Sequence, residues 1–263
     1  MRTHQSPTTI RLAKRRDASA IADIFRAGFP KALLPYTIYA QDGIVDYLKG
    51  MIQIQRVGTT SATAVAERDG EVIAWAQFHR HPHLLFLNHI YVTPEFQGTG
   101  VGRLLLRKAI EEVRDPGQRY LGSEAFATNA NALGWHAELG LEPTEMVDWI
   151  EMKPRPTESD DIWWSFDGLI TGMAALQRYG FCRIVLRTPR QAYVVRSLGT
   201  NIFRANGFDM LEDPSALTGL HTLNRHRALM CVATAPQPGT SYPIIATDQK
   251  VCGSLAEALK RMK

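Results

Sequence analysis

The chain of 263 residues has little cysteine, no long apolar run and no dense block of basic residues. Its three cysteines, Cys182, Cys231 and Cys252, are odd in number and widely spaced, which matches neither a disulfide framework nor a zinc site. Free thiols suit a reducing cytosol, so we expect a cytoplasmic protein without a bound metal. No apolar stretch reaches the roughly 18–20 residues that span a bilayer. The segment from Met1 to Pro7 lacks the apolar core of a signal peptide, so we expect no membrane association.

The charge of the chain is only mildly basic, with a net charge of +4 and a pI of about 9.0. The longest basic run is Lys14-Arg15-Arg16, which we interpret as a solvated helix start. A nucleic-acid face needs clustered Lys and Arg, so we expect no nucleic-acid partner. The composition, 45% hydrophobic and 21% charged, is that of an ordinary globular protein, and the length suits two compact units.

Apolar periodicity divides the first half into strands and helices. Alternating runs, or runs rich in β-branched and aromatic residues, predict strands at 9–13, 62–67, 72–78, 84–92, 120–125 and 149–152. Apolar residues at helical spacing predict a helix after the N-cap candidate Asp17, and helices at about 43–56, 104–113 and 129–139. The segment 29–42 carries two prolines and is expected to be irregular. This order predicts an α/β fold with helices packed on a sheet.

A proline-rich polar segment at 153–160 is the best linker candidate and sets the predicted domains. We expect a first domain at 1–153, a linker at 154–161 and an accessory domain at 162–263. In the second half we expect helices at 167–178, 190–205 and 253–263, and strands at 183–187, 208–211 and 228–233. Their order resembles that of 120–152, so a weak internal duplication is one of two open interpretations.

A glycine-rich loop, Gln97-Gly98-Thr99-Gly100-Val101-Gly102, lies between a predicted strand and a predicted helix. Such a loop places backbone N–H groups at a helix N-terminus, where they attract phosphate oxygens. Glycine allows positive φ and a close approach of the anion. The chain has no Gly-Lys-Ser/Thr there, and the loop follows several strands, so neither a Walker loop nor a dinucleotide fold is expected.

The segment from Ile90 to Leu105, which contains this loop, resembles the signature segment of the GNAT superfamily of acetyltransferases. The segment from Glu124 to Leu141, with Asn129 and His136, is similar to the family's second segment. The resemblance covers about 9–152 and implies a mixed, mostly antiparallel sheet flanked by helices, with a smaller GNAT-like α/β domain after it. It also implies acetyl-coenzyme A as cosubstrate, with no metal. The cofactor-binding residues that it implies are Ile90, Tyr91, Val92, Gln97, Gly98, Thr99, Gly100, Val101, Gly102, Arg103 and Asn129.

Acetylation of an amine needs a base, a proton donor for the leaving thiolate, and positioning. The resemblance places Glu124 at the position of a catalytic base and His136 where the family often has a proton-donating Tyr. Histidine titrates near neutrality, so the role could survive this change. His89 is a second candidate base, and strand alternation predicts that Asn88 and His89 point to opposite faces. Each of these residues also has a structural interpretation, as a packing or ion-pairing group.

The segment 202–208 resembles the second GNAT segment again, but no glycine-rich loop precedes it. We therefore expect a truncated GNAT-like second half that does not bind coenzyme A in the usual way. The predicted function is an N-acetyltransferase that moves an acetyl group directly to a primary amine of a small molecule. The alternatives are an acyl-coenzyme A sensor without turnover and a protein amine acetyltransferase. A homodimer is left open.

Overall fold

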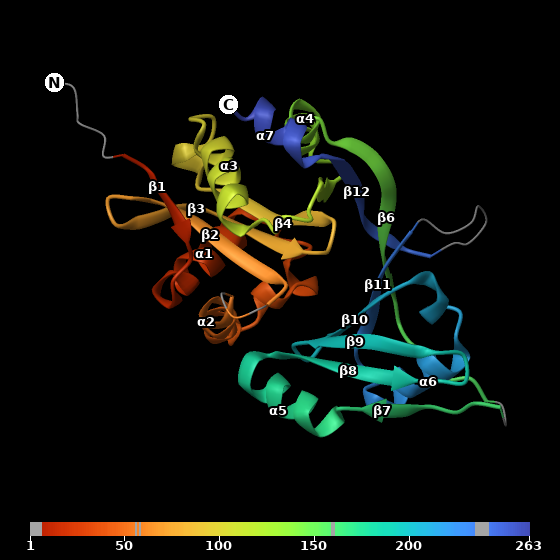
Figure 1. The fold of residues 1–263 in the computed structure, drawn as a ribbon. Coiled ribbons are helices and arrows are strands. Elements are labelled where there is room, and N and C mark those ends of the chain that lie inside the picture. Colours follow the sequence, from red (N-terminus) through yellow and green to blue (C-terminus); the bar gives the residue numbers. More distant parts are fainter. Residues whose placement is uncertain (1–6, 56, 58, 159–160, 235–241) are drawn as a thin grey trace. The chain divides into compact units, whose positions relative to one another are not determined.

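The computed structural model describes residues 7–55, 57, 59–158, 161–234 and 242–263. The expectations for the N-terminal segment and for the end of the linker at 159–160 therefore fall largely outside the described residues. The chain forms two compact units (Figure 1). The first unit contains Met1–Phe29, Val45–Thr144 and Gln249–Lys263, and the second contains Pro30–Ile44 and Glu145–Asp248.

The first unit has an antiparallel meander followed by one parallel strand pair. Its strand order is β1-β2-β3-β4-β5-β12, in which β1 to β4 are antiparallel neighbours and β4 pairs with β5 in parallel. The hairpin between β2 and β3 turns at Asp69-Gly70, where both residues have positive φ, as two-residue hairpin turns require. The elements are β1 Thr9–Leu12, α1 Ala18–Gly28, α2 Ile44–Ile54, β2 Ser61–Arg68, β3 Glu71–Arg80, β4 Leu84–Val92, α3 Val101–Val113, β5 Tyr120–Phe126, α4 Ala130–Glu138, the start of β6 Glu142–Met152, the end of β12 Ile244–Ser254, and α7 Leu255–Arg261.

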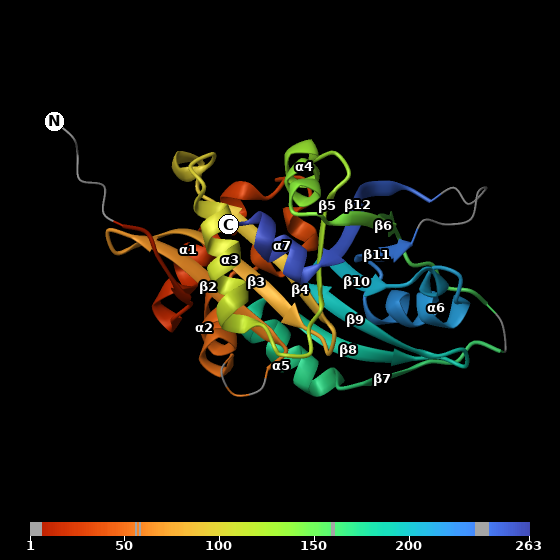
Figure 2. The same cartoon turned by 45° about the horizontal axis from the view of Figure 1, so that its top comes forward.

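One face of this sheet carries the main core of the first unit. Leu85 and Leu87 of β4 pack there against Leu105 and Leu106 of α3, since alternate residues of a strand share a face. Figure 2 shows α3 and α7 over this sheet. The last residues of the chain complete the core with Val251, Leu255, Ala258 and Met262.

The compact units therefore differ from the predicted domain bounds of 1–153 and 162–263. The C-terminal segment Gln249–Lys263 folds with the first unit, and Pro30–Ile44 folds with the second. The C-terminal helix is predicted by the sequence, but no local pattern reports which unit it joins. An accessory role for the second half stays a prediction.

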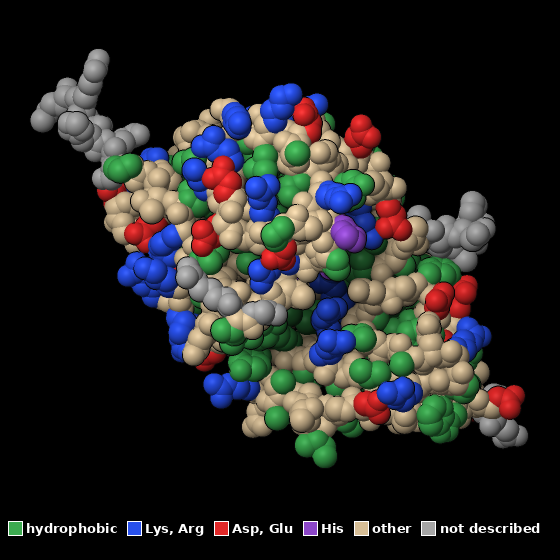
Figure 3. Space-filling model, viewed as in Figure 1, with side chains coloured by type: hydrophobic (Ala, Val, Ile, Leu, Met, Phe, Trp, Pro, Cys, Tyr) green, Lys and Arg blue, Asp and Glu red, His purple; other side chains and the backbone are tan. Residues whose placement is uncertain are grey.

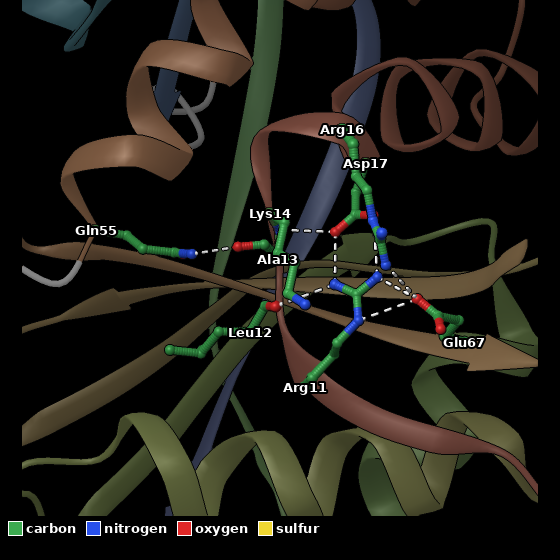
Figure 4. A network of polar contacts seen from close by, with 8 residues as sticks. All are labelled: Arg11, Leu12, Ala13, Lys14, Arg16, Asp17, Gln55 and Glu67. Atoms are coloured by element: carbon green, nitrogen blue, oxygen red, sulfur yellow. Dashed lines mark hydrogen bonds and ion pairs between the residues drawn. The ribbon is translucent and has the colours of Figure 1, made fainter. Parts of the chain in front are cut away.

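A polar network holds the start of α1 against the edge of the sheet (Figure 4). The Arg11 guanidinium donates to Asp17 at 2.6 and 3.0 Å and also bonds Glu67. Burial alone would raise the pKa of Asp17, but the bonds from Arg11 and from the Lys14 N–H hold that pKa below its ordinary value. Asp17 precedes α1 as predicted, but its side chain does not cap that helix. An open hollow of about 370 Å³ lies beside this network, lined by Arg16, Asp17, Ala20, Gly70, Glu71 and Val72.

The second unit repeats the connectivity of the first. Its strand order is β6-β11-β10-β9-β8-β7, with β7 to β10 antiparallel and β10 parallel to β11. A core of Ile184, Leu186, Phe203, Leu220 and others lies on one face. The elements are β7 Ser165–Asp167, α5 Leu169–Tyr179, β8 Phe181–Arg187, β9 Ala192–Leu198, β10 Ile202–Asn206, α6 Pro214–Leu223, β11 Ala228–Thr234, and the parts of β6 and β12 named by the unit bounds.

Two expectations for this half are wrong. The predicted helix at 190–205 is the hairpin of β9 and β10, because Tyr193, Val195 and Ser197 alternate inward with exposed residues and Gly199 turns the chain with φ 56°. The predicted strand at 208–211 is a short 3-10 helix, Phe208–Met210. The segment 202–208 therefore does not correspond to the second GNAT segment. By topology β10 matches β4, and α6 matches α3.

Candidate active site

The parallel strands β4 and β5 separate halfway along their length. Their pairing runs from Leu84 with Tyr120 to Leu87 with Ser123 and then stops, whereas β4 stays paired with β3 as far as Val92. The Ser123 hydroxyl donates to the Leu87 carbonyl at 3.0 Å and closes the point where the strands part. Beyond Leu87, the edge of β4 that faces β5 therefore has no pairing with β5, while the other edge stays bonded to β3.

A β-bulge lies at the same point of β4. Leu87 faces Phe78 and His89 faces Gln77, so Asn88 is an extra residue in β4. The Asn88 Nδ2 donates to the Gln77 Oε1 at 2.9 Å. Asn88 and His89 therefore both lie on the Gln77 face of the sheet, and the expectation of opposite faces is wrong because the bulge interrupts the alternation.

His89 belongs to an aromatic cluster on the face opposite α3. Its ring centroid lies 5.2 Å from that of Phe25, 5.8 Å from Trp75 and 6.2 Å from Tyr91. Tyr91 stacks on Trp75 with centroids 5.8 Å apart. The Tyr91 side chain is therefore committed to this cluster, and a role in holding a cofactor rests on its backbone.

Ile90 and Val92 point to the other face, where they pack against the α3 core. Their side chains are also committed to packing. Only the backbone groups of this part of β4 are therefore suited to bind an extended ligand. The resemblance implies this role for a pantetheine arm.

The glycine-rich loop joins β4 to α3 through the short 3-10 helix Pro94–Phe96. Gly98 and Gly100 have φ of 72° and 86°, which favours glycine, and a Cβ at either would meet open space. At Gly102, in contrast, a Cβ would lie 3.3 Å from Val92 Cγ2. The first two glycines therefore provide backbone conformation and access, and the third allows α3 to pack closely on β4.

Two side chains hold this loop in place. The Gln97 Nε2 donates to the Val92 carbonyl at 3.0 Å, and the Thr99 hydroxyl donates to the Phe96 carbonyl at 2.7 Å. Gly100 is the N-cap residue of α3 and offers no side-chain cap. The N–H groups of Val101, Gly102 and Arg103 lie in the first turn. They have no carbonyl partner within the helix and point out of its N-terminal end. A helix start of this kind is positively polarised and suits an anionic group.

Arg103 and Asn129 have structural partners of their own. The Arg103 guanidinium pairs with Glu138 at 2.9 Å and donates to the Arg261 carbonyl at 3.0 Å. The Asn129 Oδ1 accepts from the Ala132 N–H at 3.1 Å and caps α4. The Arg103 side chain thus ties α3 to α4 and α7, and the local need for a cap explains asparagine at 129.

Glu124 is exposed and follows Ser123, the last residue of β5 that pairs with β4. Leu121 belongs to the α3 core, so alternation places Gly122 and Glu124 on the opposite face. A Cβ at Gly122 would indeed lie beside Phe86, which is not a core residue, at 3.2 Å. Because Phe86 shares its face with Gln77 and His89 through the β3 pairing, the structure brings Glu124 and His89 to one face.

His136 lies in a different environment. It is 3% exposed on α4, and its Nδ1 has no hydrogen-bond partner among the described residues. Burial lowers the pKa of His136 from 6.5 to about 4. The imidazole is therefore neutral at pH 7, which argues against a cationic proton donor at this position.

The sequence does not reveal three features of this site: the bulge at Asn88, the Ser123 hydroxyl at the strand divergence, and the C-terminal strand that completes the sheet. A polar Asn-His pair within an apolar strand is the available signal for the bulge.

No helix among the residues with assigned structure is long and apolar enough to cross a membrane. The same residues contain no group of three or more His, Cys, Asp or Glu able to hold a metal. In Figure 3, basic and acidic side chains are interspersed over the visible face.

Comparison with known proteins gives this architecture a family. The model of the acetyltransferase (GNAT) family matches residues 20–141. An aminoglycoside N(6')-acetyltransferase type 1 from Stenotrophomonas maltophilia is 30% identical over 161 residues, covering 58% of this chain and 97% of the relative. An L-amino acid N-acyltransferase from Escherichia coli is 28% identical and covers 55% of this chain and 86% of the relative. The chain belongs to the GNAT family of N-acetyltransferases.

The whole chain also resembles solved two-unit structures in fold. A putative acetyltransferase from Pyrococcus horikoshii has a TM-score of 0.63 at 11% identity and covers 94% of this chain and 89% of that one. A tandem GNAT protein from the clavulanic acid biosynthesis pathway has a TM-score of 0.62 at 10% identity, with coverage of 94% and 98%. The two-domain GNAT fold, with a GNAT-like second unit, is thereby confirmed.

Proposed function

We propose that the first unit binds acetyl-coenzyme A where β4 and β5 diverge and transfers the acetyl group directly to a primary amine of a small molecule. The divergence beyond Leu87 and Ser123, next to the exposed N-terminus of α3, is the observation that carries this proposal. The open space at Gly98 and Gly100 fits a pyrophosphate, since phosphate oxygens can approach the backbone there. An extended pantetheine arm fits the free edge of β4.

Glu124 is the base that the geometry favours. It stands at the mouth of the divergence, and a carboxylate there can accept a proton from the ammonium form of the acceptor, directly or through water. His89 shares its face and is the second candidate. His136 is neutral and buried, so its part is restricted to packing or to a hydrogen bond from the neutral ring. Binding would supply most of the rate by positioning the amine against the thioester.

A small amine acceptor is proposed from the relatives, whose names refer to aminoglycosides and amino acids. A protein amine remains an alternative acceptor, and an acyl-coenzyme A sensor remains the alternative without turnover. A sensor would bind acetyl-coenzyme A tightly and release no thiol with any amine.

Thiol release from acetyl-coenzyme A with a panel of amines tests the proposal. We expect Glu124→Gln to lower kcat by roughly 10²–10⁴-fold, His89→Ala to have a smaller effect and His136→Phe the smallest. Glu112→Gln, an exposed residue on α3, is the matched control and should retain full activity. If all three site variants kept full activity, the proton-transfer assignment would be wrong and positioning alone would carry the rate.

A further inference from the structure

Arg68 is the last residue of β2 and lies beside the glycine-rich loop of the first unit. The Thr93 N–H donates to the Ile73 carbonyl at 2.9 Å, so the β2–β3 hairpin and the loop that follows β4 share one end of the sheet. The Arg68 guanidinium carbon lies 4.8 Å from the centroid of the Phe96 ring. Phe96 ends the short 3-10 helix, and Gly98 follows within about 7 Å of chain. The guanidinium therefore lies at the edge of the loop.

Contacts on one edge and one face hold this guanidinium in a fixed orientation. Its Nε and Nη2 donate to the Thr8 hydroxyl oxygen at 3.0 and 2.7 Å, and the Phe96 ring covers one of its faces. The ring is itself fixed, because Phe96 packs against the α3 core. A guanidinium held in this way loses less freedom when it binds a ligand than a mobile one does.

The other edge of the Arg68 guanidinium is open. It consists of Nη1 and the second N–H of Nη2, and Nη1 donates no hydrogen bond within the part of the chain that the structure describes. Arg68 is half-buried, but its Nη1 is not one of the buried polar atoms without a partner, so solvent reaches it. This edge presents two parallel N–H donors, the arrangement that binds an oxyanion in a bidentate manner.

The charge of Arg68 is also not used in an ion pair among the described residues. The neighbouring acid, Glu67, bonds Arg11 and lies 3.5 Å from Arg16. The arginine in the first turn of α3 differs from Arg68 in this respect, because Arg103 pairs with a carboxylate at 2.9 Å. Arg68 therefore offers the loop a positive charge that Arg103 has already committed to a structural contact.

We propose that Arg68 binds a phosphate group of coenzyme A through this open edge. The inference rests on the proposed function, which assigns coenzyme A to the glycine-rich loop. The backbone N–H groups of a helix start carry only partial charges, whereas a guanidinium adds a full charge and paired donors that match phosphate oxygens. Coenzyme A carries a diphosphate and a 3′-phosphate. Both share this chemistry, and analogues of the coenzyme distinguish them.

Calorimetric titration of the full chain with coenzyme A is the first test. We expect Arg68→Gln to bind coenzyme A at least tenfold more weakly than wild type, since a hydrogen bond between charged groups is lost. Arg68→Lys keeps the charge without the paired donors and should fall between the two. Arg114→Gln is the charge-matched control, because Arg114 is exposed and follows the far end of α3. This control should bind as wild type.

Titrations with dephospho-coenzyme A and with pantetheine identify the group that Arg68 binds. If it is the 3′-phosphate, wild type binds dephospho-coenzyme A at least tenfold more weakly than coenzyme A, and Arg68→Gln causes no further loss. If it is the diphosphate, Arg68→Gln weakens the binding of both coenzymes at least tenfold. Pantetheine has no phosphate, so wild type and Arg68→Gln should bind it equally.

Equal binding of coenzyme A by wild type, Arg68→Gln and Arg114→Gln would overturn this inference and leave the proposed function intact. An equal loss of affinity for coenzyme A and pantetheine in Arg68→Gln would also overturn it, because Arg68 would then support the loop and not contact phosphate. If wild type bound no coenzyme A at all, the inference and the proposed function would both fail. Far-UV circular dichroism checks that every variant is folded.

Discussion

The two units each contain a parallel strand pair joined by a helix, but the two pairs differ where a ligand would enter. In the first unit the pairing of β4 with β5 ends at Leu87 and Ser123. In the second, β10 and β11 are paired along all of β10, and the Gly207 N–H continues the ladder to the Val232 carbonyl at 3.0 Å. The second pair therefore leaves no free strand edge for an extended arm.

The helix starts differ in the same sense. Helix α3 begins at Gly100 without a side-chain cap. Helix α6 begins at Asp213, which is 1% exposed and accepts from the Ser215 and Ala216 N–H groups at 3.0 and 3.2 Å. The protein's own carboxylate thus occupies the place that a phosphate would take at α3. The fold alone does not make a site, since the site needs an open strand pair and an uncapped helix together.

The largest expected effect is on stability, and it concerns helix α7, which packs in the core of the first unit. Leu255 is 2% exposed in the core of the first unit, so Leu255→Ala should lower the free energy of unfolding by roughly 3–5 kcal/mol. Leu259→Ala, a partly buried position on the same helix, should cost less. Native-state hydrogen exchange should show faster opening of β5 and α3. Faster opening confined to β8–β10 would show that this segment stabilises the second unit instead.

His136 should make the first unit sensitive to mild acid, whereas the second has no buried histidine among the described residues. The folded pKa of His136, about 4, lies below its ordinary value of 6.5, so the unfolded state binds the proton more readily. Stability is therefore full above pH 6.5 and falls by about 3 kcal/mol as the pH drops to about 4. His136→Phe should flatten this part of the profile in urea unfolding followed at a series of pH values. An unchanged slope would mean that another group carries it.

Much of the first unit follows from its sequence because local and tertiary signals agree there. Strand β4 and the αL glycines of the loop are read from apolar runs and glycine spacing. The bulge at Asn88 is not, because an extra residue in a strand is decided by pairing with β3. The burial of His136 cannot be predicted from the sequence either, because it results from the packing of α4 in the folded protein.

The second unit is harder to predict. Between 190 and 205 the apolar residues satisfy a helical and a strand period equally well, and pairing with β8 selects the strand.

A matched pair of glycines separates conformational strain from ligand binding. Gly100 in the first unit and Gly207 in the second both have positive φ, 86° and 93°, and a Cβ added at either would meet open space. Gly100→Ala should weaken coenzyme A binding about 100-fold, because the side chain and the strained backbone both disturb the anion site. Gly207→Ala should destabilise the protein at least as much, since its ψ of 139° lies in a region that is nearly restricted to glycine, and should leave the affinity unchanged. Calorimetric titration with coenzyme A should also give one site per chain, and two sites would remove the contrast between the units.

The smallest effect tests whether Asp213 acts as the internal anion of the second unit. Its Oδ2 accepts from the Thr188 hydroxyl at 2.7 Å and from the Tyr193 hydroxyl at 3.0 Å. Burial, together with this bond, raises the pKa of Tyr193 to about 12. Asp213→Asn keeps an acceptor for the helix N–H groups but removes the charge, so we expect a loss of about 2 kcal/mol and a lower pKa for Tyr193 in alkaline spectrophotometric titration. Coenzyme A should still bind one site per chain, because β10 and β11 remain closed. A second site in this variant would mean that the carboxylate alone had excluded the ligand, and that strand closure contributes nothing to the difference between the units.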